Sequence, residues 1–108
     1  MKRRIVIERA AEEDLLEITT FIREDRPSAA LRFVAATKEA FSQLSDYPHM
    51  GSHMGSGYLS DHPKLQNVRL RPIKGFDRYL IFYRADSKTV FIERVLYSGR
   101  DLNILLED

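Results

Sequence analysis

The chain has 108 residues, 44% of them hydrophobic, and a formal net charge of +1, so its length allows one compact domain with its own core. The absence of cysteine excludes disulfides, thiol nucleophiles and zinc–thiolate sites. No stretch reaches the ~20 apolar residues of a membrane helix, and the basic start leads into a strand pattern rather than a signal peptide, so we expect one cytoplasmic domain over residues 1–108.

Charge is distributed unevenly along the chain. Between Glu8 and Asp46 nine acidic residues stand against five basic ones, a net charge of −4. Between Lys64 and Arg100 nine basic residues stand against three acidic ones, a net charge of +6. A cationic half can attract nucleic acid or an acidic protein, and the charge does not choose between them. A soluble surface with uneven charge remains the simpler interpretation.

The first elements are a strand and an amphipathic helix. Residues Lys2 to Glu8 alternate weakly and predict a strand at one side of the sheet. The pattern then changes to helical spacing, with an apolar stripe made by Ala11, Leu15, Ile18 and Ile22 and widened by Leu16 and Phe21. Three acids follow the expected helix start, Glu12, Glu13 and Asp14. We interpret them as helix-end electrostatics, because carboxylates are favoured beside exposed N–H groups.

A second helix is predicted from Pro27 onward. Proline disfavours helical geometry in the residue before it and suits a first helical turn, so the first helix should end near Asp25–Arg26. One side of the second helix is apolar, with Ala30, Phe33, Val34, Thr37, Phe41 and Leu44. The two helices should form a hairpin. Burial of a large apolar side chain contributes roughly 1.5–3 kcal/mol, so we assign Phe33, Phe41, Leu15 and Ile18 to the core.

Residues Tyr47 to Gln66 show neither the helical nor the strand spacing of apolar residues, and they contain three glycines and two prolines. We interpret them as a loop of about twenty residues, a length that suggests function, ordering by a partner or disorder. It holds His49, His53 and His62. Histidines spaced by glycines make a poorly preorganised metal site, so no metal is expected.

Three apolar runs follow, rich in aromatic and β-branched residues: Val68–Ile73, Arg78–Arg84 and Thr89–Tyr97. Turn residues separate them, which predicts a three-stranded antiparallel meander. After Ser98–Gly99, Asp101 is placed to cap a short apolar helix that packs its leucines on the domain.

The order and motifs of these elements resemble the ParE/RelE superfamily of toxins from type II toxin–antitoxin modules. The resemblance rests on five segments in order: 10–15 (AAEEDL), 27–33 (PSAALRF), 44–51 (LSDYPHMG), 79–84 (YLIFYR) and 95–102 (VLYSGRDL). It implies an α+β fold, β-α-α-β-β-β-(α), with a helical hairpin packed on a small, mainly antiparallel sheet.

The superfamily contains two mechanisms. RelE-like members cut mRNA on the ribosome with basic residues and a C-terminal tyrosine, and metal-free RNA cleavage needs a base, an acid and phosphate-binding cations on one face. In this chain Leu80 occupies the central-strand arginine position, Leu106 lies near the tyrosine position, and Lys64 and Arg100 are the remaining cations. The chain therefore looks closer to the ParE-like plasmid stabilisation toxins.

The ParE resemblance implies a non-enzymatic toxin that inhibits DNA gyrase and replication by protein contact and is neutralised by a ParD-like antitoxin. The candidates for target binding or toxicity are Arg69, Arg71, Tyr83, Arg84, Arg94, Arg100 and Asp101. Arginine suits this role because its planar fork binds carboxylates and phosphates. A structural role, in which Arg84 or Arg100 pairs with Glu93 or Asp101, is equally compatible with the sequence.

The candidates for antitoxin binding are Phe21, Leu31 and Val34, because two helices on a sheet leave an outer side free for a partner. No cofactor is expected. The sequence leaves open a homodimer and direct binding to nucleic acid. Two alternative functions also remain open, a RelE-like mRNA endonuclease and an inactive module that only binds antitoxin.

Overall fold

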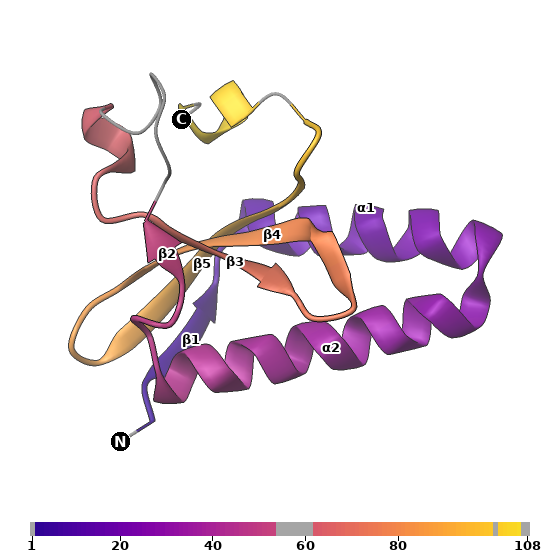
Figure 1. Cartoon of the computed structure of the whole chain (residues 1–108), viewed down its shortest axis with the longest axis horizontal. Coiled ribbons are helices and arrows are strands. Elements are labelled where there is room, and N and C mark those ends of the chain that lie inside the picture. The colour runs from indigo at the N-terminus through magenta and orange to yellow at the C-terminus, as the bar shows by residue number, and fades with distance from the viewer. Residues whose placement is uncertain (1, 54–61, 101, 107–108) are drawn as a thin grey trace.

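The computed structural model describes residues 2–53, 62–100 and 102–106. Its helices and strands are, in chain order, β1 (Arg4–Ile7), α1 (Arg9–Asp25), α2 (Pro27–Asp46), β2 (Ser52–His53), the 3₁₀ helix η1 (Pro63–Leu65), β3 (Arg69–Ile73), β4 (Phe76–Ala85), β5 (Thr89–Tyr97) and the 3₁₀ helix η2 (Leu102–Leu106). The strands form one sheet in the order β1-β5-β4-β3-β2. Figure 1 shows the predicted α+β fold, with the helical hairpin against the sheet.

The sheet is antiparallel except at one edge. The predicted meander is present as β3, β4 and β5. The first strand lies at the side of the sheet, as expected, and pairs with β5 in parallel, from Arg4 opposite Thr89 to Ile7 opposite Ile92. The register of β4 against β5 shifts at Phe82/Tyr83, where Arg94 and Ile92 are the successive partners. This bulge lets Ile92 and Val95, three residues apart, contribute to the same core.

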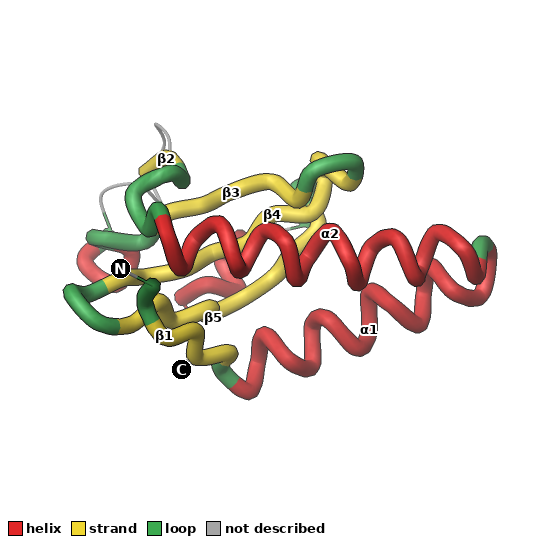
Figure 2. Tube along the Cα trace, turned by 90° about the horizontal axis from the view of Figure 1, so that it is seen from below, coloured by secondary structure: helices red, strands yellow, loops and turns green. Residues whose placement is uncertain are grey.

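The two helices form the predicted hairpin. The helix α1 ends at Asp25 and α2 begins at Pro27, because proline fits the first turn, where its missing N–H is not needed. Figures 1 and 2 show that the turn between the helices extends beyond the sheet. No helix in the described part of the chain is long and apolar enough to span a membrane.

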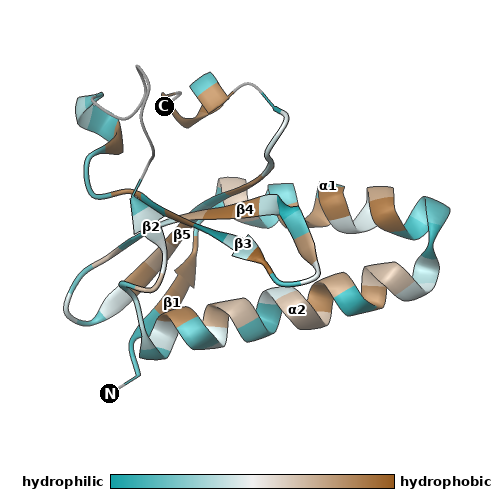
Figure 3. Cartoon of the chain, viewed as in Figure 1, coloured by the Kyte–Doolittle hydropathy of each residue, from teal (hydrophilic) through white to brown (hydrophobic). Residues whose placement is uncertain are grey.

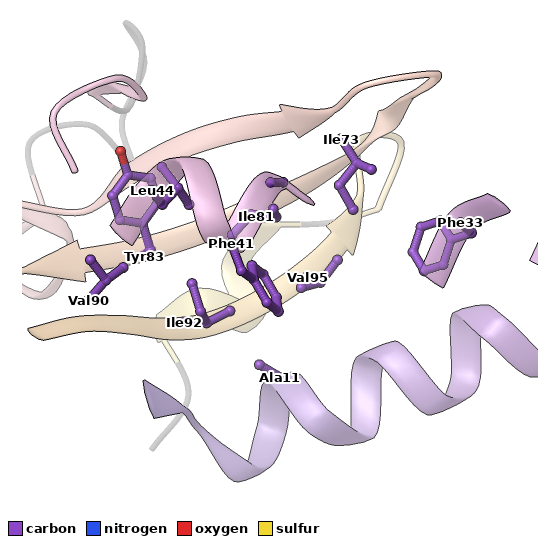
Figure 4. Close-up of a cluster of buried hydrophobic side chains, with 11 residues drawn as sticks. Ala11, Phe33, Phe41, Leu44, Ile73, Ile81, Tyr83, Val90, Ile92 and Val95 are labelled. Atoms are coloured by element: carbon purple, nitrogen blue, oxygen red, sulfur yellow. The ribbon is translucent and has the colours of Figure 1, made fainter. Parts of the chain in front are cut away.

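The main core lies between the hairpin and one face of the sheet (Figure 4). The predicted core residues Phe33 and Phe41 are buried there, and Leu15 and Ile18 pack against it while partly exposed. The predicted stripe on α1 is too wide, however. Leu16 and Phe21 are 71% and 68% exposed, because they lie on the two flanks of a stripe whose centre already fills the contact with the core.

A smaller apolar cluster covers the other face of the sheet. Leu65, Val68, Phe82 and Leu96 are buried in it, and the leucines and isoleucine of η2 pack against them. Figure 1 shows η1 and η2 together on the side of the sheet away from α2, and Figure 3 shows hydrophobic residues along the strands between the two layers. The C-terminal segment therefore packs back on the domain, as predicted.

Two predicted boundaries need correction. The strand β4 begins at Phe76, earlier than the expected Arg78, because the turn before it is only Lys74–Gly75. The segment Tyr47–Gln66 is not wholly a loop, since β2 pairs with Arg69 and Leu70 of β3 and η1 forms later in the segment. Residues 54–61 of this segment lie outside the described residues.

Candidate functional site

The parallel strand β1 covers only half of β5. It pairs as far as Ile92, and Glu8 donates its N–H to the Ile92 carbonyl at 2.9 Å. Beyond this point α1 runs beside β5 instead of a strand. The Val95 N–H, which faces this open edge, donates to Asp14 Oδ2 at 3.0 Å. A carboxylate on a helix thus takes the place of a neighbouring strand's carbonyl.

Asp14 also forms an ion pair with Arg94 of β5. The guanidinium donates from Nε and Nη2 to the two carboxylate oxygens, both at 2.8 Å, and the side chains are 7% and 19% exposed. This corrects the interpretation of Asp14 as helix-end electrostatics. Asp14 is a buried connection between α1 and β5, whereas Glu13 forms an exposed pair with Arg9 and Glu12 lies in the first turn.

A groove of about 420 Å³ opens beside this connection, between α1 and the C-terminal half of β5. We call it the Tyr97 groove. The side of α1 that lines it consists of Asp14, Glu17, Ile18 and Phe21. The opposite side consists of Tyr79, Val95, Leu96, Tyr97 and Arg100. Its volume falls within the ~300–1,000 Å³ of ordinary ligand pockets, which are also mostly apolar with a few polar groups.

A chain of aromatic rings connects the groove to the core. The ring of Phe33 on α2 contacts the rings of Phe76 and Tyr79 edge-on, with centroid distances of 5.2 and 5.6 Å. The rings of Tyr79 and Tyr97 also meet edge-on, with their centroids 5.6 Å apart. Burial, together with the neighbouring Tyr97, raises the pKa of Tyr79 above its ordinary value of 10.0. The Tyr79 hydroxyl is therefore neutral at physiological pH. Tyr97 is 43% exposed, so one side of its ring is supported and the other is free.

The turn after β5 also positions Tyr97. A side chain at Gly99 would place its Cβ 2.7 Å from Cε2 of Tyr97, so only glycine leaves the ring where it lies. The Arg100 N–H donates to the Tyr97 carbonyl at 3.0 Å, which places Arg100 at the end of the groove. The predicted candidate Arg100 is exposed, and its side chain has no polar partner within the described residues.

The other predicted arginines are occupied within the chain. Arg69 donates to the Gly51 carbonyl at 2.8 Å, and Arg71 donates to Gln43 Oε1 at 2.6 Å. Both lie on the helix side of the sheet, since their register partners Tyr83 and Ile81 belong to the main core. Arg69 shares a separate depression with Arg84. Arg84 also shares a depression with Arg94, whereas Arg100 lines the Tyr97 groove.

Arg84 connects the sheet to the segment before β3. Its Nε donates to Glu93 Oε1 at 2.7 Å and its Nη1 donates to the Gln66 carbonyl at 2.9 Å, while Nη2 donates to the Lys64 carbonyl. Lys64 in turn donates from Nζ to the Leu106 carbonyl at 3.0 Å. Arg84 therefore forms the structural pair with Glu93 that the sequence allowed, and it also holds η1 against the sheet. Lys64 connects η1 to η2.

Tyr83 is fully buried and cannot be a contact residue on the surface of the folded chain. Its hydroxyl donates to the Pro48 carbonyl at 2.7 Å and accepts the Gly51 N–H at 2.9 Å. Burial raises the pKa of Tyr83, against the opposing effects of the Gly51 hydrogen bond and of two nearby arginines. A Cβ at Gly51 would lie 2.5 Å from this hydroxyl. Tyr83 thus positions the start of the segment that leads to β2.

The antitoxin candidates lie in different places. Phe21 lines the Tyr97 groove, so it shares a surface with Arg100, a target candidate. Leu31 on α2 is 75% exposed and Val34 is partly buried. The remaining target candidate, Asp101, lies outside the described residues.

The three residues considered for RNA cleavage, Lys64, Leu80 and Arg100, lie in different places within the described residues. Lys64 is bonded to the Leu106 carbonyl, and Leu80 packs in the smaller apolar cluster with the η2 side chains. His62 accepts the Lys64 N–H at 3.1 Å, which is a local turn. Lys64 and Arg100 line no common cavity among those found in the described part of the chain. Nor do its residues contain a group of three or more potential metal ligands.

The fold is that of a solved type II toxin–antitoxin protein. A chain of the chromosomal ParDE TA system from P. aeruginosa superposes with a TM-score of 0.68 at 21% identity, over 89% of this chain and 96% of that one. The family model of the ParE toxin of type II toxin–antitoxin systems, parDE, matches residues 5–102. This chain belongs to the ParE toxin family. No curated protein matches it in sequence.

Only Phe21 and Arg100 among the residues that line the Tyr97 groove were predicted as functional, and the polar side chains of Glu17, Tyr79 and Tyr97 were missed. The two tyrosines are separated by eighteen positions and become neighbours only through the register of β4 and β5, in which Tyr79 lies opposite Tyr97. A sequence signal was present, since the last apolar run ends in an aromatic residue two positions before Gly99. The sequence does not place that residue beside α1.

Proposed function

We propose that this chain is the toxin of a ParDE pair that inhibits DNA gyrase, and thereby replication, through protein–protein contact without an enzymatic step, and that a ParD-like antitoxin neutralises it. The observation that carries the proposal is family membership over residues 5–102, combined with an exposed groove whose rim holds Tyr97 and Arg100. Tyrosine and arginine are enriched among the residues that dominate protein-interface energies.

Lys64 and Arg100 lie apart within the described residues, which favours contact over cleavage. An endonuclease of this fold would need its base, acid and cations on one exposed face. The face of the sheet under η1 and η2 carries the smaller apolar cluster, and its Arg84 is paired with Glu93 and bonded to the Gln66 carbonyl. Arginine and tyrosine in the groove can bind a partner's carboxylates and apolar side chains without any such chemistry.

The proposal is tested with purified chain and purified gyrase in a DNA supercoiling assay, beside primer extension on mRNA from cells that express the chain. We expect inhibition of supercoiling and no cuts in phase with codons. Codon-phased cuts with unaffected supercoiling would instead establish the mRNA endonuclease alternative and overturn the proposal.

The third alternative, an inactive module that only binds antitoxin, is tested by growth arrest on induction. We expect arrest with the natural chain and at least partial relief with Arg100→Ala, because Arg100 is exposed and its side chain makes no polar contact within the described residues. Arg84→Ala is less informative, since it removes the contacts that hold η1. Unimpaired growth with the natural chain would favour the inactive module.

A further inference from the structure

We propose that a depression at one end of the sheet binds the phosphate of a nucleotide unit, whether in a nucleic-acid strand or in a free nucleotide. We call it the His53 depression. Its volume is about 350 Å³, and its lining includes His49, His53, Asn67, Arg69, Arg84 and Phe91. The inference concerns a part of the chain that the proposed function leaves unused, and it does not rest on gyrase as the target.

The His53 depression and the Tyr97 groove lie at opposite ends of β5. Phe91, in the first half of β5, lines the depression, whereas the groove borders the second half, from Val95 to Tyr97. Asp86 adds the turn between β4 and β5 to the depression, and Figure 1 shows this turn at the end of the sheet opposite the turn between the helices. A ligand in the depression would therefore leave the groove open.

Arg69 keeps one edge of its guanidinium available. Its Nη1 donates to the Gly51 carbonyl at 2.8 Å, and its Nε and Nη2 make no polar contact within the described residues. Gly51 is itself fixed, because its N–H donates to the buried Tyr83 hydroxyl at 2.9 Å. Nε and Nη2 form the edge that donates two parallel hydrogen bonds to a phosphate. Because Arg69 is held in place before binding, it loses little conformational entropy when a phosphate arrives.

The two histidines add donors whose charge depends on pH. His49 and His53 are exposed, and their side chains make no polar contact in the part of the chain that the structure describes. His53 lies directly opposite Arg69 in the pairing of β2 with β3, which places the two side chains side by side on one face of the sheet. Imidazole titrates close to neutral pH, and a bound phosphate favours its protonated form. Phosphate binding should therefore strengthen as pH falls.

The remaining charges at the depression are paired or compensated. The Arg84 guanidinium donates to Glu93 at 2.7 Å, so this pair adds little net charge. The Asp86 carboxylate accepts the N–H of Lys88 at 2.8 Å and that of the next residue at 2.7 Å, and these bonds lower its pKa. Asp86 is therefore negative, but the charges of Arg3 and Lys88 lie close to it. Arg69 and the two histidines thus decide the sign of the local charge, which is positive.

Phe91 and Asn67 suit the part of a nucleotide that is attached to the phosphate. The Phe91 ring is partly exposed in the lining, so a base or sugar can lie against it. Asn67 has a left-handed backbone with a φ of 70°, which asparagine adopts more readily than most residues. Its exposed amide makes no polar contact among the described residues. Cationic groups beside an aromatic ring are the combination with which proteins bind single strands without a sequence preference.

Binding is tested by NMR titration of the full chain with inorganic phosphate, with AMP and with a short single-stranded DNA. We expect AMP and the DNA to shift the amide signals of Gly51, His53 and Arg69, while those of Tyr97 and Arg100 stay unchanged. Tighter binding of the DNA than of AMP would identify a strand as the source of the phosphate, and equal or weaker binding of the DNA would identify the free nucleotide. Absence of these shifts, or binding of inorganic phosphate as tight as that of AMP, would overturn the inference.

The histidines are tested by the pH dependence of DNA binding, because the internal phosphates of a strand keep their charge between pH 6 and pH 8. We expect the natural chain to bind several-fold more tightly at pH 6 than at pH 8. His49→Gln combined with His53→Gln should remove this dependence, whereas His62→Gln, at a histidine that does not line the depression, should preserve it. The same dependence in all three chains would overturn the assignment of the two histidines.

The arginine edge is tested with Arg69→Lys, which keeps the charge but loses the planar fork. It should weaken binding by about fivefold or more, the scale of one lost charge-assisted hydrogen bond. Arg78→Lys is the matched control, because Arg78 is an exposed arginine of β4 that does not line the depression, and it should change the Kd by less than about twofold. Equal effects of the two substitutions would contradict phosphate binding by Arg69.

The outcome for the depression is separate from the outcome for gyrase, since none of these assays contains gyrase. A depression that binds no nucleotide in a chain that still inhibits supercoiling overturns the inference alone. Nucleotide binding in a chain without effect on supercoiling overturns only the proposed target.

Discussion

The two faces of the sheet are covered by very different amounts of structure. Two long helices, of 17 and 20 residues, cover one face and bury Phe33, Phe41 and Leu44 against it. Two short 3₁₀ helices of three and five residues cover the other, and no residue of η2 is fully buried. Because apolar burial supplies most of the stabilising free energy, the helical face should determine global stability and the 3₁₀ face should open locally.

The candidate arginines also differ in the layer that each one contacts. Arg94 acts between the sheet and α1, and Arg84 acts between the sheet and η1. Both are components of the fold. Arg100 lies at the end of the Tyr97 groove and is exposed, and its side chain has no polar partner within the described residues.

The largest expected effect is the loss of a large side chain from the helical face. Phe33→Ala should lower the free energy of unfolding by about 3–5 kcal/mol. The fully buried Phe33 ring loses its burial free energy, and its removal also leaves a cavity in the core. Leu105→Ala, on the partly buried η2, should cost about 1 kcal/mol. Urea unfolding of both variants measures the difference. Equal losses of stability would show that the helical layer and the 3₁₀ layer stabilise the sheet equally.

Removal of the buried carboxylate comes next. Asp14→Ala leaves Arg94 and the Val95 N–H without their partner, and breaking a buried pair costs about 3 kcal/mol or more. Glu13→Ala is the control, since its pair with Arg9 is exposed and should be worth about 0.5 kcal/mol or less. Thermal unfolding of both variants measures the two losses of stability. If Asp14 acted only through helix-end charge, Asp14→Ala and Glu13→Ala would lower the stability by similar amounts.

The hydroxyl of Tyr83 should contribute less. Tyr83→Phe keeps the ring in the core but leaves the Gly51 N–H and the Pro48 carbonyl unpaired, which costs about 1–3 kcal/mol for a buried group. Tyr47→Phe is the matched control, because Tyr47 is 65% exposed. Denaturant unfolding measures both. Identical stabilities would mean that water replaces the lost hydroxyl.

A smaller and local effect is expected at the 3₁₀ face. Arg84→Gln removes donors to the carbonyls of Lys64 and Gln66, so the amides of η1 and η2 should exchange hydrogen faster while global stability falls by about 1 kcal/mol. Hydrogen exchange followed by mass spectrometry reads the two regions separately. Faster exchange throughout α1 and α2 as well would mean that the 3₁₀ face is not a separate opening unit.

The smallest effect concerns alkaline pH. The pKa values of Tyr79 and Tyr83 are raised in the folded chain above 10.0, so the unfolded chain loses these protons first as pH rises. The stability that they contribute is fully present below pH 10 and is lost as pH rises through the folded pKa values. Urea unfolding between pH 8 and 11 tests this. Tyr79→Phe should reduce the pH dependence, and an unchanged pH dependence in this variant would contradict the prediction.

The sequence alone determined the elements of this protein and their order. The apolar spacing of Ala11 to Ile22, the proline at position 27 and the turn residues between the last three strands are local signals, and each acts within a few residues of itself. They were sufficient for the hairpin, the meander and most of the core. They also carried the resemblance to the ParE family, which residues 5–102 bear out.

Only the tertiary structure decided which polar residues are occupied and which are free. Asp14 and Arg94 are 80 positions apart, and Tyr97 becomes part of a groove only because β1 ends before β5 does. No local pattern reports such pairings, since they depend on strand register, on the bulge in β5 and on where α1 passes the sheet edge. That is why the sequence listed seven target candidates of equal rank, while the fold buries or occupies most of them and leaves Arg100 exposed beside an unpredicted tyrosine.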